Sequence, residues 1–220
     1  MTGFPFLKAL EVKRYMRDYI KPAVILFIIC VVVSSALSLT NSVTAGIIKE
    51  RVEADAVETR RQVLADADSF EKIDLEEYLT KSNLEKLDFD AILEVYKGYS
   101  NGKFCGYAFT AETKGYGGKI KVIIGINEEG RTTGVRIIES NETPGLGSKA
   151  YEEPFISQLI GILPKKPLSV VKGKKTSDDE IEAISGATIT SKAMVKAVQA
   201  AIDVSAELRK AEAGGKGNEK

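Results

Sequence analysis

The residues most suited to chemistry lie between Ser185 and Thr190, where the sequence reads Ser-Gly-Ala-Thr-Ile-Thr. The hydroxyls of Ser185, Thr188 and Thr190 lie where a helix is predicted to begin, and Gly186 permits a sharp turn into it. The first N–H groups of a helix have no intrahelical partner, and the helix dipole adds partial positive charge there. The stretch therefore predicts a phosphate site or, as the ordinary reading, a capped helix.

The helix that would position this stretch starts near Ser191. Apolar residues recur at Val195, Val198 and Ile202, and Leu208 continues the stripe. This i, i+3, i+7 spacing is typical of a helix that buries one face. The hydroxyls would then lie at the end of a helix held against a core.

Two glycine-rich segments, residues 115–118 and 142–147, frame the central predicted strands. Pro-Gly and Gly-Gly are turn sequences, so each segment is first of all a predicted loop. Neither fits a Walker A loop, and neither fits the Rossmann fingerprint in its strand–turn–helix context. A nucleotide site of either kind is not predicted.

Taken together, these three segments resemble a known family, the FMN-binding subunits RnfG of Rnf complexes and NqrC of Na⁺-translocating NADH:quinone reductases. Three motifs recur there: Gly-Tyr-x-Gly before an apolar strand, Glu-Thr-Pro-Gly-Leu-Gly at 142–147, and Ser-Gly-Ala-Thr-x-Thr at 185–190. The resemblance spans roughly residues 107–204, and RnfG matches better than NqrC. Residues 47–106 carry no matching motif.

The resemblance implies that FMN is bound covalently, through an ester between its phosphate and the hydroxyl of Thr190. It also implies that the other residues of these segments surround the flavin. Glu142 and Thr143 would offer hydrogen bonds, and Tyr116 an aromatic neighbour. Leu146 would contact the ring, with Gly147 permitting close approach. The motif residues expected to shape the loop or contact the phosphate are Ser185, Gly186, Ala187 and Thr188.

By the same resemblance, the chain is an electron-transfer subunit of a membrane-bound ferredoxin:NAD⁺ oxidoreductase that moves Na⁺ or H⁺. Its implied partners are the other subunits of that complex, a flavin transferase that uses FAD, and the lipid bilayer. The chain would not be a catalyst alone. Two readings stay open beside it: the NqrC component of the quinone reductase, and a membrane-anchored binding module without a cofactor.

Composition narrows the chemistry further. The chain has 31 basic and 31 acidic residues, so nothing indicates nucleic-acid binding. It has no histidine and only two cysteines, Cys30 and Cys105, which disfavours a zinc or iron–sulfur site and removes the commonest general base. A serine hydrolase using Ser185 is disfavoured as well, because the chain lacks both Gly-x-Ser-x-Gly and a histidine.

An apolar segment precedes the predicted domain. Residues 22–45 are long and apolar enough to form a transmembrane helix. Five basic and two acidic residues precede the segment, and the residues that follow it have no basic excess. The positive-inside rule then predicts a single-pass protein of the inner (cell) membrane, with residues 1–21 in the cytoplasm and the main domain outside. A cleaved signal peptide is the competing reading, although the apolar run exceeds its usual length.

The predicted fold class is α+β, with the membrane helix followed by one domain in which helices cover an antiparallel sheet. Residues 46–90 are expected to form a helical connector, with a second helix near 75–87. The FMN-binding domain is expected at 91–208, with an Asn-Gly hairpin at 101–102 and a short strand at 168–171. Residues 149–160 and the helix after Thr190 are the candidates to cover the sheet. The tail, 209–220, is expected to be disordered.

Overall fold

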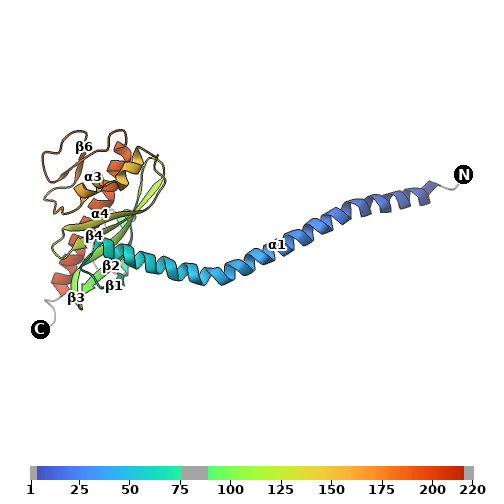
Figure 1. The fold of residues 1–220 in the computed structure, drawn as a ribbon, viewed down its shortest axis with the longest axis horizontal. Coiled ribbons are helices and arrows are strands. Elements are labelled where there is room, and N and C mark those ends of the chain that lie inside the picture. The colour runs from blue at the N-terminus through green and yellow to red at the C-terminus, as the bar shows by residue number, and fades with distance from the viewer. Residues whose placement is uncertain (1–3, 76–88, 216–220) are drawn as a thin grey trace. The chain divides into compact units, whose positions relative to one another are not determined.

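The computed structural model describes residues 4–75 and 89–215. The chain divides into two compact units, Met1–Ala54 and Asp55–Lys220, which are described separately below. Helices and an antiparallel sheet confirm the predicted α+β class (Figure 1). The elements are α1 (Phe4–Val63), β1 (Ser69–Ile73), η1 (Phe89–Ala91), β2 (Ile92–Ser100), β3 (Lys103–Lys114), β4 (Lys119–Asn127), β5 (Thr132–Ser140), η2 (Gly147–Tyr151), α3 (Glu153–Ile156), η3 (Ser157–Leu159), β6 (Ser169–Val171), β7 (Glu180–Glu182) and α4 (Thr188–Gly215).

The first unit consists of the part of α1 that precedes Asp55. Its stretch Ile20–Ser42 has a mean hydropathy of 2.6, and 0% of it is buried within the structure. A helix of this length and composition can cross a bilayer, so the structure is consistent with a single-pass membrane anchor. The expected boundary between anchor and connector, at residue 45, is not a break in the helix, which continues to Val63.

The second unit is organised by a five-stranded antiparallel sheet in the order β1-β2-β3-β4-β5. Every strand pairs with the next one in sequence, and the predicted Asn-Gly turn at 101–102 joins β2 to β3. The register places Val95 opposite Phe109, Phe109 opposite Ile124, and Ile124 opposite Val135. These side chains are 0–4% exposed, so their shared face forms the core.

Strand β1 departs from the expected helical connector. Its sequence, Ser-Phe-Glu-Lys-Ile, lacks the alternation of apolar and polar residues that predicts a strand. Only Ile73 among its residues is buried. Its pairing with the edge of β2, from Ser69 opposite Tyr99 to Ile73 opposite Val95, is what makes it a strand. The second predicted helix, 75–87, lies outside the described residues except for Leu75.

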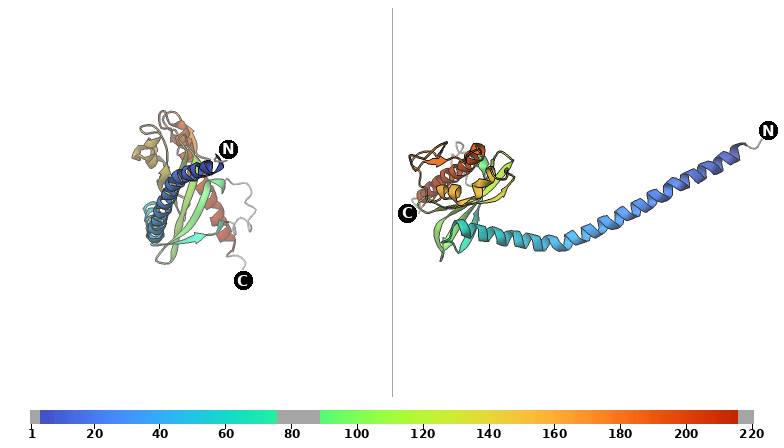
Figure 2. Two further views of the ribbon diagram at one scale, coloured as in Figure 1. Left: turned by 90° about the vertical axis from the view of Figure 1, so that its right-hand side faces the viewer. Right: turned by 45° about the horizontal axis from the view of Figure 1, so that its top comes forward.

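Helical segments cover both faces of the sheet, where the sequence predicted one covered face. Helix α4 packs on the core face and contacts β2, β3 and β4. The last turns of α1 pack on the other face, where the backbone of Val63 lies so close to Gly125 and Gly134 that a Cβ on either glycine would overlap it. The guanidinium of Arg60 lies 3.5 Å from the ring centre of Tyr96 on β2. Figure 2 (left) shows the strands between these two segments.

Of the two predicted covering segments, the one after Thr190 is confirmed as the long helix α4. Residues 149–160 form three short helical pieces, η2, α3 and η3, in place of one helix. Their Phe155 and Leu159 still reach the core, at 3% and 0% exposed. The predicted strand at 168–171 is confirmed as β6, which pairs with β7 in parallel.

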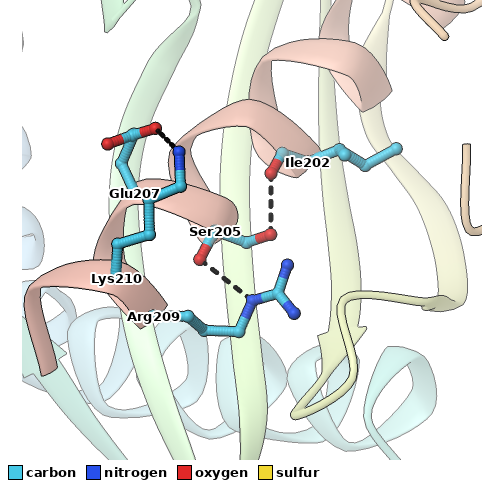
Figure 3. Close-up of polar contacts among 5 residues, drawn as sticks. All are labelled: Ile202, Ser205, Glu207, Arg209 and Lys210. Atoms are coloured by element: carbon cyan, nitrogen blue, oxygen red, sulfur yellow. Dashed lines mark hydrogen bonds and ion pairs between the residues drawn. The ribbon is translucent and has the colours of Figure 1, made fainter. Parts of the chain in front are cut away.

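The expected disordered tail is wrong for residues 209–215, because α4 continues to Gly215. Arg209 donates a hydrogen bond to the carbonyl of Ser205, and Lys210 forms an ion pair with Glu207 (Figure 3). Glu212 forms an ion pair with Lys97 on β2. The ion pair of Glu212 with β2 is a long-range contact in a segment whose glycines and charges predicted disorder.

Candidate functional site

The motif residues form the turn that leads into α4. Gly186 adopts a φ of 77°, a left-handed conformation that glycine adopts without strain. The hydroxyl of Ser191, which is fully buried, accepts a hydrogen bond from the N–H of Ile184 and donates one to the carbonyl of Ala187, each at 3.0 Å. Ser191 therefore fixes the turn from inside the helix, a role that its sequence position alone did not indicate.

The side chain of Glu142 connects this turn to a second loop. Its Oε1 accepts hydrogen bonds from the N–H groups of Tyr116 at 2.8 Å and Gly117 at 3.2 Å. Its Oε2 accepts the hydroxyl hydrogen of Thr190 at 2.9 Å. Both members of this last pair are buried, with Glu142 9% and Thr190 0% exposed. The predicted hydrogen bonding of Glu142 to the loop is thus present, and it includes the motif itself.

These segments surround a cavity of about 490 Å³, a volume in the range of small-molecule sites. All of the predicted site residues line it except Ser185, which is exposed outside the lining. Ile189 lines it as well and was not predicted. The lining residues are Tyr116, Glu142, Thr143, Leu146, Gly147, Gly186, Ala187, Thr188, Ile189 and Thr190.

The rim of the cavity is apolar and exposed. Tyr116 is 70% exposed, Ile189 54% and Leu146 45%. Leu146 also lies against Gly186, where a Cβ would be 3.1 Å from its Cδ2. Ile189 was detectable from the sequence, because it falls off the apolar stripe that α4 buries, and an apolar residue off that stripe is exposed.

The two threonines of the motif differ in access. Both line the cavity, but Thr190 is fully buried and its hydroxyl is bonded to Glu142, whereas Thr188 is half-buried. The backbone ladder of α4 begins with the bond from the N–H of Ser191 to the carbonyl of Ala187. Among residues 4–75 and 89–215, no acceptor bonds the N–H groups of Thr188, Ile189 and Thr190. The cavity therefore borders threonine hydroxyls and the unpaired N–H groups at the start of α4.

The cysteine of the second unit is not part of this cavity. Cys105, on β3, is half-buried and does not line it. Burial, and after it the negative charge of Asp66, raises the pKa of the Cys105 thiol. A raised pKa keeps the thiol protonated and unreactive near neutral pH.

Comparison with known proteins identifies the family. Residues 115–203 match the model of the FMN-binding domain. The chain is 44% identical, over 86% of its length and 93% of the relative's, to the RnfG component of the Na⁺-translocating ferredoxin:NAD⁺ oxidoreductase complex of Acetobacterium woodii. It is 32% identical, over 80% of its length and 84% of the relative's, to the corresponding component of the proton-translocating complex of Clostridium ljungdahlii.

A solved structure shows a weaker likeness. NqrC of the Na⁺-translocating NADH-quinone reductase from Parabacteroides distasonis overlaps 58% of this chain and 63% of its own, with a TM-score of 0.41 and 22% identity. This overlap is too small to bear on fold or function, whereas the sequence relatives span nearly the whole chain. The chain belongs to the RnfG family of FMN-binding components of ion-translocating ferredoxin:NAD⁺ oxidoreductase (Rnf) complexes.

Proposed function

We propose that this chain is the FMN-carrying electron-transfer subunit of an ion-translocating ferredoxin:NAD⁺ oxidoreductase complex. The observation that carries the proposal is the cavity at the start of α4, which the matched FMN-binding segment lines from three separate stretches of sequence. Bound FMN supplies one- and two-electron redox chemistry. The chain's own residues bind the flavin, orient it and limit its contact with water.

The residues that line the cavity suit the two ends of FMN. Unpaired N–H groups at the start of α4 suit a phosphate, and the helix dipole favours its charge. The apolar side chains of Tyr116, Leu146 and Ile189 suit an isoalloxazine ring. The same cavity thus offers a polar end and an apolar end, as an amphipathic cofactor requires.

We further propose that the flavin is covalently bound, through an ester between its phosphate and the hydroxyl of Thr190. Thr190 lines the cavity, and the unpaired N–H groups at the start of α4 beside it suit the phosphate of such an ester. The Thr190 hydroxyl donates to Glu142 in the structure, so forming the ester replaces this hydrogen bond.

Attachment at Thr190 is a phosphoryl transfer from FAD. The Oγ of Thr190 forms a bond to the phosphorus of the flavin half, and the bond from that phosphorus to the bridging oxygen breaks. AMP leaves with the bridging oxygen, and the hydroxyl proton is released. A flavin transferase would catalyse this step, and no oxidant or reductant is consumed.

The charges around the apolar segment support one orientation of the chain in the membrane. Five basic residues precede the segment, which supports a cytoplasmic N-terminus and a flavin domain outside the inner membrane. Protease added to spheroplasts should then digest the domain; a domain protected until the membrane is lysed would contradict this. The relatives differ in their named ion, Na⁺ in one and protons in another, so family membership leaves the coupling ion open.

The test compares matched variants of Thr190. Full-length protein is co-expressed with a flavin transferase, denatured and analysed by intact mass and peptide mapping. Thr190→Val should lack the adduct of about 438 Da, the mass of FMN less one water, and Thr190→Ser should retain it. An adduct mapped to Thr188, or one that survives in Thr190→Val, would contradict attachment at Thr190. Wild-type protein without any adduct would contradict covalent attachment, and the absence of flavin from the native protein as well would favour a cofactor-free binding module.

A further inference from the structure

The hydroxyl of Thr190 is closed off in the folded domain. Thr190 is 0% exposed, and its hydroxyl hydrogen is donated to Oε2 of Glu142 at 2.9 Å. A phosphoryl transfer brings the phosphorus of FAD to the hydroxyl oxygen, together with the enzyme groups that align the two. The cavity of about 490 Å³ has the size of a site for one cofactor, without room for an enzyme's active site around it. The closed form of the motif is therefore not a form on which a transferase can act.

The loop side of this hydrogen bond is firmly held. Oε1 of Glu142 accepts two N–H groups of the β3–β4 loop, at 2.8 Å and 3.2 Å. Hydrogen bonds to a charged acceptor are stronger than neutral ones. Gly115 and Gly147 also pack so closely on the carboxylate that a Cβ on either glycine would overlap it. When the bond to Thr190 breaks, the segment free to move is therefore the start of α4.

The motif segment, residues 185–190, has few other attachments. Four of its six residues are exposed or half-buried: Ser185, Gly186, Thr188 and Ile189. Little apolar surface therefore leaves the core when the segment moves out. Its helical residues 188–190 have N–H groups that bond no acceptor in the described part of the chain, so opening breaks no hydrogen bond of theirs. The bond from Thr190 to Glu142 is the main restraint on the segment.

Contacts beyond the segment hold both of its ends. The Ser191 hydroxyl accepts the N–H of Ile184 at 3.0 Å, which joins the residues on either side of the segment. The hydroxyl of Thr113 on β3 donates to the carbonyl of Ala193 at 3.0 Å, and the next residue, Met194, is fully buried. Opening can thus end at Ser191 while the rest of α4 stays packed. Local opening of this kind costs less free energy than global unfolding.

We propose that residues 185–190 open as one unit and that the flavin transferase acts on this opened segment. This rests on the proposed function, in which Thr190 accepts the flavin. In the opened form, Oγ of Thr190 bonds to the phosphorus of the flavin half of FAD, AMP leaves with the bridging oxygen, and the hydroxyl proton is released. Glu142 restrains the unmodified chain, because its hydrogen bond with Thr190 holds the segment closed.

A restraint and a direct chemical role of Glu142 predict effects of opposite sign. If the carboxylate aligned or deprotonated the hydroxyl during the reaction, its loss would slow attachment. If it holds the segment closed, its loss raises the opened population. The rate of a reaction that needs the open form follows that population when opening and closing are fast. The sign of the change in rate therefore decides between the two roles.

The experiment uses full-length protein in detergent, purified without flavin and then treated with dilute flavin transferase and excess FAD. Glu142→Gln replaces the oxygen that accepts from Thr190 with an amide NH₂, so the charge-assisted bond is lost. Leu146→Ala is an independent variant, because Leu146 is half-exposed and lies against Gly186 of the segment. Initial rates are followed by intact mass, at a temperature where circular dichroism shows each variant to be folded.

The second measurement is amide exchange at Ser191, followed by NMR without transferase. The N–H of Ser191 bonds the carbonyl of Ala187 at 3.0 Å, so its exchange reports opening of the segment. The matched control is Arg209→Ala, which removes contacts at the other end of α4. It lowers global stability without loosening the motif.

We expect Glu142→Gln to raise the initial rate of flavinylation roughly three- to tenfold, since one charge-assisted bond of the closed form is lost. Leu146→Ala should raise it roughly two- to fivefold. Exchange at Ser191 should accelerate by similar factors in both variants. Arg209→Ala should leave both the flavinylation rate and the Ser191 exchange within about twofold of the wild type.

The results that would overturn the opening can be told apart from failure of the proposed function. With the adduct on Thr190, an unchanged or lower rate in folded Glu142→Gln or Leu146→Ala would refute the opening alone. So would a faster rate without faster exchange at Ser191, or an equal gain in Arg209→Ala. Wild-type protein without an adduct, or with the adduct on another residue, would refute the proposed attachment, and the opening with it.

Discussion

Helix α4 is attached to the rest of the domain by different chemistry at its two ends. Near its start, the attachments are buried: Thr190 bonds Glu142, and the hydroxyl of Thr113 on β3 donates to the carbonyl of Ala193 at 3.0 Å. Near its end they involve charged groups that are partly exposed, such as the ion pair of Lys97 with Glu212, whose side chains are 21% and 31% exposed.

The two kinds of attachment differ in how strictly they define the geometry of α4. A buried polar group has no water to replace a lost partner, so each bond at the start of α4 fixes one geometry. A charged group at the surface can exchange its partner for water at little cost. The end that borders the cavity is thus the end with the strictly defined geometry, as a binding site requires.

The largest effect should come from Ser191→Ala. The substitution removes the acceptor of the Ile184 N–H and should destabilise the domain by about 1–3 kcal/mol, the usual loss for a buried group left unpaired. Urea unfolding of the full-length protein in detergent, followed by circular dichroism, measures it. The matched control is Ser185→Ala, since Ser185 is exposed, and its effect should stay within about 0.5 kcal/mol. Equal effects would refute the contrast between buried and exposed hydroxyls.

Arg209→Ala should have a smaller effect, near 1 kcal/mol. Its guanidinium packs against Gly130 in the β4–β5 turn, and it donates to the carbonyls of Ser205 at 3.3 Å and Glu128 at 3.5 Å. The remaining carbonyls can be hydrated, so the loss is limited. The same unfolding assay measures it, with Lys192→Ala as a control on the same helix. A loss of stability as large as that of Ser191→Ala would show that the two ends of α4 are held equally strictly.

The same contrast explains what could be predicted from the sequence. The apolar stripe of α4 and the Asn-Gly hairpin are local patterns, and both were predicted correctly. Strand β1 and the last turns of α4 depend on partners distant in sequence, so local composition gave a helix for one and disorder for the other. Long-range pairing overrides such local preferences.

At the site, the motifs predicted which residues gather but not what each one does. Glu142, Leu146 and Thr188 were expected in one place, and the cavity brings them together. The burial of Thr190 was not predictable, because it depends on a carboxylate 48 residues away in sequence. A motif gives residue types and order, whereas access to a hydroxyl is a property of the packed structure.

The smallest effect should come from Lys210→Ala. The ammonium of Lys210 lies 2.7 Å from Oε1 of Glu207, and the two side chains are 72% and 29% exposed (Figure 3). Both residues belong to α4, so the pair does not join the helix to the sheet, and its loss should cost less than about 0.5 kcal/mol. The same unfolding assay, run at low and high salt, should show the small difference shrinking as salt screens the charges. A loss above roughly 1 kcal/mol that persists in high salt would mean that the end of α4 is held as strictly as its start.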